Sequence, residues 1–479
     1  MCVVELSLSG HVETMQQVQH QLDALSADAS FLPSLFDIIA LDTISLDIRV
    51  AAAIFLKNML KKSWLDLTAS QNDPIWRETI RNRLLEIVIH CPYSHIVLQC
   101  AEGLRIVGRT DFIGGVWPEL PTTLQMACQA CVGPQHLPQP GPWERCLIAC
   151  NAIAKSLQYA DYDEEGNEPL CAELFLQSLL PVFLQFIQAI STCERTSLSI
   201  HANGIVLVQK AIFRCCYSSR TPLLSAEALE AFLRLGASQL QRLKEAVCLF
   251  GEHALQCPEE HDTVETCPLL AAQLSQVVGL QPPALPPLLK SVKRHAMFLK
   301  QLSKLQAESL HSHLLHGAFQ ELLAFSVQLV QAPLPVLLPL SNHPSLLRTL
   351  QALLEVIDAV LLSNSLGDRL IHGNVISTLG KDLIVPALRL HRQECEQWNA
   401  DPEEFIRLNF PSESLFFDTE VTGIRPSVLL IAEHLRDVLQ GRQAQAARKP
   451  PKKKQGARGR SRGARAQDPS PAIIAEDLA

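Results

Sequence analysis

The 479-residue sequence predicts an all-α protein built from stacked pairs of helices, followed by a disordered basic C-terminal tail. Apolar residues recur three and four positions apart almost throughout, which is the spacing of amphipathic helices, and strand-type alternation is hard to find. Hydrophobic residues make up 47% of the chain and aromatic residues only 5%, so Leu, Ile, Val and Ala must supply most of the packing. A chain of this length is too long for one compact globule, which favours a stack of repeats.

The N-terminal region divides into pairs of helices at short polar or proline-containing breaks. The expected pairs are 11–25 with 31–41, 45–64 with 74–90, and 94–109 with 115–131. In the segment Leu46–Trp64, a helical winding places Ile48, Ala52, Phe55 and Met59 in one apolar stripe, with Arg49, Lys57 and Lys61 facing water or a partner. We therefore expect Phe55 to be fully buried between neighbouring repeats.

The pairing continues after a break rich in proline and glycine at 133–142. Two further pairs are expected at 143–158 with 169–190 and at 198–218 with 225–250; later helices are expected near 271–278, 288–306, 310–331, 344–362, 373–391 and 426–440. A pair about every 40 residues is the HEAT-type period, in which neither helix of a pair can bury its apolar face alone. The sequence thus predicts a HEAT-type helical-repeat solenoid.

Charge is unevenly distributed along the chain. Residues 442–479 contain ten Arg and Lys against three acids, a balance of +7, while the whole chain carries −8, so residues 1–441 carry −15. An acidic body suits a receptor for basic partners, although the sign of the charge says little about the fold.

The tail has three alternative interpretations. Arg442–Arg465 has ten basic residues, no acids and no bulky apolar residue, so it cannot offset chain entropy by burial and should be disordered. A short cationic cluster resembles a one-part nuclear localisation signal, formed by Arg448, Lys449, Lys452, Lys453 and Lys454. Arg458–Arg465 looks instead like an arginine-glycine arm that would bind RNA phosphates, and a solubilising extension without a binding role is the third reading.

No catalytic constellation, cofactor motif or metal site is expected, and we predict that the protein is not an enzyme. The one metal-like grouping is Cys128 and Cys131 with His136, Cys146 and Cys150 nearby, and we interpret it as ordinary thiols, because zinc prefers thiolates on tight turns. The fifteen scattered cysteines indicate reduced thiols in a cytosolic or nuclear protein. The longest apolar tract, Leu322–Leu340, is interrupted by polar residues and prolines, so we expect no membrane role.

Four segments resemble importin-β-type (karyopherin) nuclear transport receptors in the same order along the chain. Leu46–Trp64, with its Arg, small residues, Leu-Lys-Asn run and Trp, is similar to their second helical repeat. Trp117–Leu120 resembles an aromatic-Pro-acid helix start, and Leu207–Phe213 resembles a further helix. Trp398–Phe405 is similar to an irregular segment of the importin-seven and importin-eleven branch. Family members are usually much longer, so the resemblance is to a receptor shortened at its C-terminus.

The resemblance implies the function and the partners. It implies N-terminal Ran-binding-type repeats at 12–125, further HEAT-type repeats at 126–441 and the tail at 442–479. The small GTPase Ran, in its GTP form, would bind the helices around 31–41, 76–90 and 115–128. On 76–90 the residues left facing a partner would be Arg77, Glu78, Arg81 and Asn82.

By the same resemblance, protein cargo and nuclear pore proteins would be further partners. The protein would shuttle between nucleus and cytoplasm and visit the nuclear envelope, with import favoured over export. The alternative is a helical-repeat scaffold outside transport that binds nuclear protein or, through residues 442–465, RNA.

Overall fold

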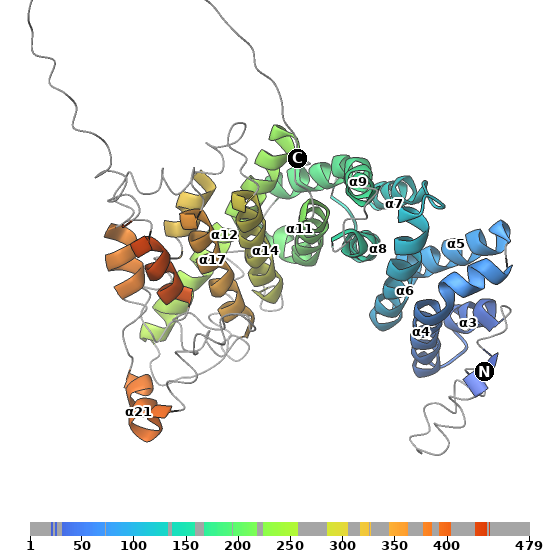
Figure 1. Cartoon of the computed structure of the whole chain (residues 1–479), viewed down its shortest axis with the longest axis horizontal. Helices are drawn as coiled ribbons and strands as arrows, with labels where there is room; N and C mark the ends of the chain where they lie inside the picture. The colour runs from blue at the N-terminus through green and yellow to red at the C-terminus, as the bar shows by residue number, and fades with distance from the viewer. Residues whose placement is uncertain are drawn as a thin grey trace, which may run out of the picture. The chain divides into compact units, whose positions relative to one another are not determined.

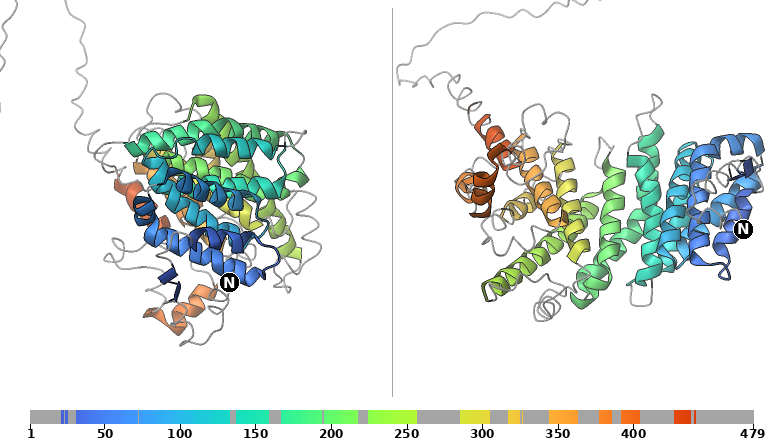
Figure 2. Two further views of the ribbon diagram at one scale, coloured as in Figure 1. Left: turned by 90° about the vertical axis from the view of Figure 1, so that its right-hand side faces the viewer. Right: turned by 90° about the horizontal axis from the view of Figure 1, so that it is seen from below.

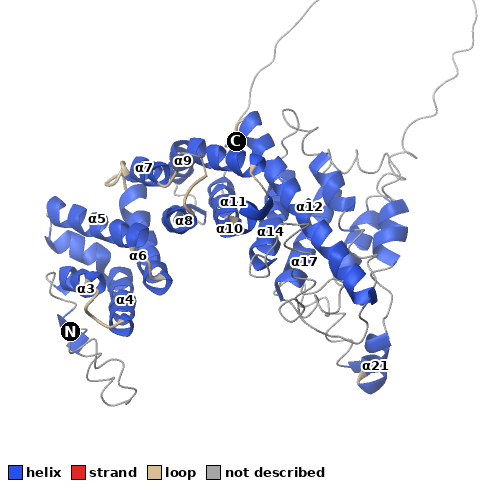
Figure 3. Ribbon diagram, turned by 180° about the vertical axis from the view of Figure 1, so that it is seen from behind, coloured by secondary structure: helices blue, strands red, loops and turns tan. Residues whose placement is uncertain are grey.

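The computed structural model describes residues 21–22, 24–25, 31–71, 73–132, 137–158, 167–193, 195–217, 224–256, 285–304, 317–324, 326, 344–362, 377–385, 392–403, 427–437 and 440. These residues form helices and connecting turns with no strand (Figure 3), apart from an isolated bridge between Val132 and Pro138. The chain separates into two units, residues 1–435 and 436–479, and the helices described below belong to the first. The predicted all-α helical-repeat fold is confirmed.

The helices alternate between two series along the chain (Figure 1). The first series is α4 (Leu46–Gln71), α6 (Ser94–Ile113), α8 (Pro140–Gln158), α11 (Ala202–Tyr217), α14 (Leu285–Lys304) and α17 (Pro344–Leu362). The second series is α3 (Phe31–Ala40), α5 (Pro74–His90), α7 (Leu120–Ala130), α9 (Asn167–Thr192) and α12 (Ala226–Gln256). Each helix of the first series packs against the next one (Figure 2), and α3, α5, α7, α9 and α12 pack against this row from the other side.

Every step of the first series also carries a polar tie between neighbouring helices. Side chains on one helix bind a side chain or a backbone carbonyl of the next, and the surrounding contacts are apolar. The ties are Lys57 to Gln99 (2.9 Å), Lys155 to Glu102 (3.5 Å), Asn151 to the Leu207 carbonyl (2.8 Å), Ser291 to Gln209 (2.6 Å) and Thr349 to the Leu289 carbonyl (3.1 Å). Apolar packing is not directional, so by itself it does not specify the register between neighbouring helices. The polar ties fix that register.

The buried face of α4 differs in part from the sequence prediction: Ala52 and Met59 are buried as predicted, but Phe55 and Arg49 are not placed as predicted. Leu56 is completely buried, whereas Phe55 is half-buried and meets the ring of Phe31 edge-on at 6.3 Å. Arg49, predicted to face water or a partner, is 5% exposed and donates to the carbonyl of Ile39 at 2.9 Å. The prediction was wrong because α4 packs against both α3 and α6, so its buried face is wider than one stripe.

Two other segments differ from the sequence prediction. Helix α7 begins at Leu120 instead of 115, because Gly115 at φ 70° breaks the chain direction after α6. Helix α21 (Arg392–Ala400) was not predicted, since the sequence around Trp398 was read as irregular. Within the predicted helix 373–391 the structure describes 377–385, where Thr378–Ile384 forms the π-helix η3.

One described helix, Cys171–Thr192 within α9, is long and apolar enough to cross a membrane by length and composition. In the structure it packs against α7, α8, α11 and α12, which bury Phe175, Phe183 and Ile187. The core helix of a helical-repeat protein passes the same test of length and composition.

Leu56→Ala should lower the free energy of unfolding of the N-terminal repeats by about 2–5 kcal/mol, because it leaves a cavity between α4 and its neighbours. Phe55→Ala is the matched comparison and should cost clearly less, since Phe55 is only half-buried. Urea unfolding followed by the fluorescence of Trp64 and Trp76, which stack at a centroid distance of 6.0 Å, measures both variants. A larger loss for Phe55→Ala would contradict the packing seen here.

His295 should make stability depend on pH. This residue is 2% exposed and lies where α14 meets α12. The ring is so close to Gly236 that a Cβ atom on residue 236 would overlap it. Burial lowers the pKa of His295 from 6.5 to about 4. Between these values the unfolded chain binds a proton that the folded chain does not, so the free energy of unfolding should fall as pH drops from about 6.5 to 4. The loss should reach about 3 kcal/mol, at 1.36 kcal/mol per pKa unit.

Urea unfolding at several pH values, compared with His295→Gln, measures this loss. The variant should lose that part of the pH dependence, while His95→Gln, which removes an exposed imidazole on α6, should retain it. Parallel pH curves for the wild type and His295→Gln would contradict the prediction.

Candidate partner-binding surface

Helix α5 carries the four residues predicted to face a partner. Its start is fixed by Asp73, whose side chain accepts a hydrogen bond from the backbone N–H of Ile75 at 2.9 Å, with Pro74 in the first turn. Its apolar face, with Ile80, Leu84 and Val88, is buried. The opposite face of this helix is therefore the one available to a partner.

Arg77 and Arg81 do not belong to that available face, so the prediction for this pair requires correction. Both donate to the carboxylate of Asp111 on α6, Arg81 through Nε at 2.5 Å and Arg77 through Nε at 3.0 Å and also through Nη2. Arg81 is 5% exposed and Asp111 is fully buried. The arginines turn inward because burial of an unpaired carboxylate would cost far more than ordering two side chains around it.

Asp111 joins four parts of the chain. Its carboxylate also accepts a hydrogen bond from the indole N–H of Trp64 on α4 at 3.0 Å. Its backbone carbonyl accepts from the N–H groups of Val116 and Trp117 at 2.8 and 2.9 Å, which closes the turn between α6 and α7. We call Asp111, Arg77, Arg81, Trp64 and Trp117 the Asp111 cluster.

The Asp111 cluster contains two positive charges and one negative charge. Each guanidinium lies over an indole ring, with the Arg77 carbon 5.8 Å from the Trp64 centroid and the Arg81 carbon 5.4 Å from the Trp117 centroid. The negative faces of these rings stabilise the second cation within the core. The cluster is therefore structural, and it sets the orientation of α5.

Glu78 and Asn82 lie on the exposed side of α5, as predicted. Glu86 continues the same exposed row one turn further, at four-residue spacing. We call Glu78, Asn82 and Glu86 the α5 row. It is acidic and exposed, and it contains Glu78 and Asn82, the two residues of the predicted site that a partner can reach.

A weak sign of the role of Asp111 is present in the sequence, and the prediction missed it. It is an acid at the end of an apolar helix, followed by Phe112 and a double glycine, and such an acid needs a cation to be buried. Arg77 and Arg81 lie 34 and 30 positions earlier in the chain, so only the tertiary structure shows that they supply it.

The cysteines considered for a metal site line the contact between α7 and α8. The sulfurs of Cys128 and Cys150 lie 4.0 Å apart and those of Cys131 and Cys146 lie 3.6 Å apart, at thiol hydrogen-bond distance. Contact with the Cys128 thiol and burial raise the pKa of Cys146 to about 12, so this thiol keeps its proton. Within the described part of the chain no group of three or more His, Cys, Asp and Glu residues could hold a metal ion, and His136 lies outside that part.

The proposed nuclear signal, Arg448, Lys449, Lys452, Lys453 and Lys454, lies outside the described residues, as does the RNA-binding candidate at 442–465.

Asp111→Ala should lower the free energy of unfolding of the N-terminal repeats by about 3–5 kcal/mol, because it leaves two buried or half-buried arginines without their carboxylate. Asp37→Ala is the control: Asp37 pairs with Arg83 at 2.5 Å on the surface, so its loss should cost less than about 1 kcal/mol. Urea unfolding followed by fluorescence reports on this region, because Trp64 and Trp117 both belong to the cluster. Equal losses in the two variants would contradict the structural role of Asp111.

Residues 18–90 match the family model of the importin-beta N-terminal domain. The match includes α3 and α4 and ends at His90, the last residue of α5. Importin-8 of Mus musculus is 29% identical over 198 residues, which is 40% of this chain and 18% of that protein. Importin-8 of Danio rerio is 28% identical over 193 residues, which is 39% of this chain and 17% of that protein. Less than a fifth of the length of either relative is therefore covered.

The solved structure of the exportin Cse1 in its cargo-free, cytoplasmic state is similar over 94% of this chain and 44% of that chain, with a TM-score of 0.61. Sequence identity is 16%, so this likeness shows a common fold. The N-terminal domain match and the similarity to Importin-8 support a relationship of this chain to the importin-β superfamily, and the structural comparison shows that the helical-repeat fold is shared.

Proposed function

We propose that the protein is a nuclear transport receptor of the importin-β type that binds a Ran-type GTPase in its GTP form together with protein cargo. The observation that carries the proposal is the importin-beta N-terminal domain over 18–90, whose last helix, α5, bears the exposed α5 row. Import is favoured over export by the resemblance to the importin-seven and importin-eleven branch. Nuclear pore proteins would be further partners, and the protein would shuttle between nucleus and cytoplasm and visit the nuclear envelope.

The α5 row supplies the chemistry for binding a GTPase. Glu78 and Glu86 present carboxylates on one exposed stripe, and Asn82 between them offers both a donor and an acceptor. Such a stripe suits a basic patch on the partner, and the acidic body of the chain would speed the encounter. Arg77 and Arg81 act indirectly, since they hold α5 against α6 through Asp111.

In this proposal, coupling between GTPase and cargo passes through the row of packed helices. A ligand on α5 acts on α6 through the Asp111 cluster, and α6 is tied to α8 by Lys155 and Glu102. Two ligands that favour different arrangements of such a row change each other's affinity reciprocally, typically by about 1–3 kcal/mol. The protein would therefore act by binding and release and would catalyse no reaction.

The alternative is a non-transport scaffold that binds nuclear protein or RNA through the tail. The observation in its favour is the composition of residues 442–465, which contain ten basic residues and no acid. Such a segment binds nucleic acid mainly through phosphate contacts, and the binding weakens steeply with salt.

The decisive test is capture of a Ran-type GTPase by the full chain, with the GTPase loaded with GTP or with GDP. We expect capture that is selective for the GTP form. Glu78→Lys should weaken it about tenfold, because charge reversal places a lysine opposite a basic partner surface. Glu227→Lys, at an exposed position on α12, is the matched control and should leave capture unchanged.

Equal capture of the two nucleotide forms, or no capture, would overturn the transport proposal. The scaffold alternative would then be supported by salt-sensitive binding of a single-stranded RNA oligonucleotide that is lost when residues 442–479 are removed.

A further inference from the structure

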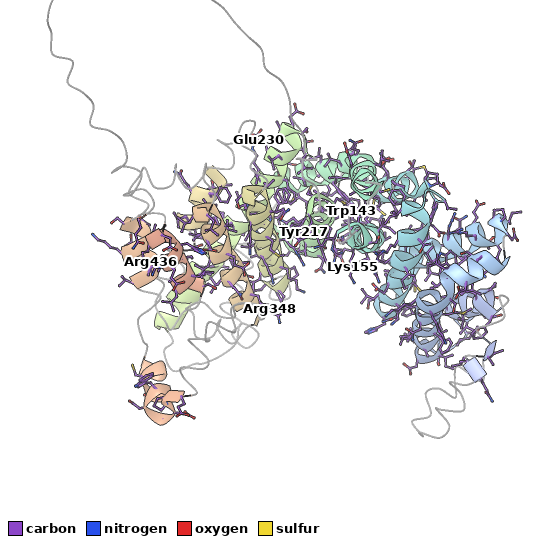
Figure 4. All side chains as sticks on the ribbon, viewed as in Figure 1. Trp143, Lys155, Tyr217, Glu230, Arg348 and Arg436 are labelled. Atoms are coloured by element: carbon purple, nitrogen blue, oxygen red, sulfur yellow. The ribbon has the colours of Figure 1, made fainter. Side chains whose placement is uncertain are left out.

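Two neighbouring helices of this acidic protein carry basic residues and no acids. Helix α11 contains Lys210 and Arg214, and α14 contains Lys290, Lys293, Arg294, Lys300 and Lys304, with no Asp or Glu in either helix. The two helices pack directly against each other, and α8, whose last turn carries Lys155, packs against α11. Figure 4 shows Lys155 on α8 and Tyr217 at the end of α11, which locate this region.

Five of these cations form a group that we call the basic cluster: Lys155, Lys210, Arg214, Lys290 and Arg294. The two guanidinium groups are held in place, since Arg214 donates to the carbonyl of Asn151 at 2.8 Å and Arg294 lies 5.8 Å from the centroid of Phe213. Lys155 reaches Glu102 at 3.5 Å, a carboxylate that Arg105 already binds at 2.7 Å. The two arginines are thus held by contacts within the chain, and among the described residues Lys155 shares its carboxylate partner with Arg105.

Lys210 lies in an environment that disfavours its charged form. It is half-buried, and neither Lys210 nor Lys290 forms an ion pair with any described residue. Burial and the nearby charges of Arg214, Arg294, Lys155 and Lys290 lower the pKa of Lys210 to about 8. A half-buried ammonium surrounded by four cations is stabilised when carboxylates approach it.

We infer that the basic cluster is a docking surface for an acidic polypeptide segment, a short run of Asp and Glu in a partner protein. Packed helices lie about 8–10 Å apart, so α8, α11 and α14 span about 16–20 Å. An extended peptide advances about 3.3 Å per residue, so five or six residues cross the three helices. Alternate side chains of such a segment point the same way and would place two or three carboxylates over the cluster.

The surroundings of the cluster favour a short acidic peptide over nucleic acid. Glu102 on α6 lies at one end, and Glu355 on α17, which binds Lys300 at 2.7 Å, lies at the other. A long polyanion with a charge every few ångströms would run onto these carboxylates and the acidic body of residues 1–441, whereas five or six residues would not. This inference concerns the charge of a partner and does not depend on binding of a GTPase, so the two proposals can fail independently.

The test measures binding of fluorescein-labelled octaglutamate to the full chain by fluorescence anisotropy, with octaglutamine as the uncharged probe. The variants are Lys290→Glu, at an exposed position, and Lys210→Met, which removes the half-buried charge with little change of shape. Lys61→Glu, at an exposed position on α4, is the charge-matched control. Because all variants keep the basic tail, binding of the probe by the tail is a constant background.

We expect salt-sensitive binding of octaglutamate but not of octaglutamine, weakened at least fivefold by each cluster variant and unchanged by Lys61→Glu. Circular dichroism with an unaltered melting curve for Lys290→Glu establishes that the loss is not unfolding. Binding that both cluster variants leave unchanged would place the octaglutamate on the tail and overturn the inference. If Lys290→Glu weakened the binding of a single-stranded RNA dodecamer as strongly as the binding of octaglutamate, this result would also overturn the inference, in favour of a nucleic-acid surface.

Discussion

Packing of each first-series helix against the next is the interaction on which the rest of this structure depends. Neither helix of a HEAT-type pair can bury its apolar face alone, so every repeat derives its stability from its neighbours. The row from α4 to α17 is continuous, and each of its steps combines buried Leu, Ile, Val and Phe side chains with at least one polar tie. The apolar area supplies the driving force, and the ties select one register among many of similar burial.

Charge is handled in two opposite ways along this row. At Asp111 a buried carboxylate is matched by two arginines and an indole N–H, and the second cation rests on an aromatic face. At Lys210 the cations of three helices meet, and this lysine has no carboxylate partner among the described residues. The first arrangement is complete within the chain and belongs to the architecture. The second has no described carboxylate paired with Lys210, which is the physical reason for proposing an acidic partner.

The two surfaces proposed for binding differ in charge and in position along the chain. The α5 row lies in the importin-beta N-terminal domain, and its exposed side chains are acidic. The basic cluster lies on α8, α11 and α14, beyond that domain. Surfaces of opposite charge on different helices attract partners of opposite charge, so a basic GTPase surface and an acidic peptide segment would not compete electrostatically.

Periodicity in the sequence determined the fold class and most helix positions, because apolar spacing and turn residues are local properties. The expected family came from the resemblance of four segments to importin-β-type receptors. The helix over 74–90 was predicted with the bounds that the structure gives it, and Glu78 and Asn82 were correctly expected to be exposed.

The tertiary structure alone decided which charges are buried. Arg49, Arg77 and Arg81 look solvent-facing on a helical wheel, but α4 and α5 contact several neighbours and a distant Asp111 needed cations. The depth of Phe55 and the meeting of Lys210 with Lys155 and Lys290 likewise depend on contacts between helices far apart in the chain, which local periodicity does not encode.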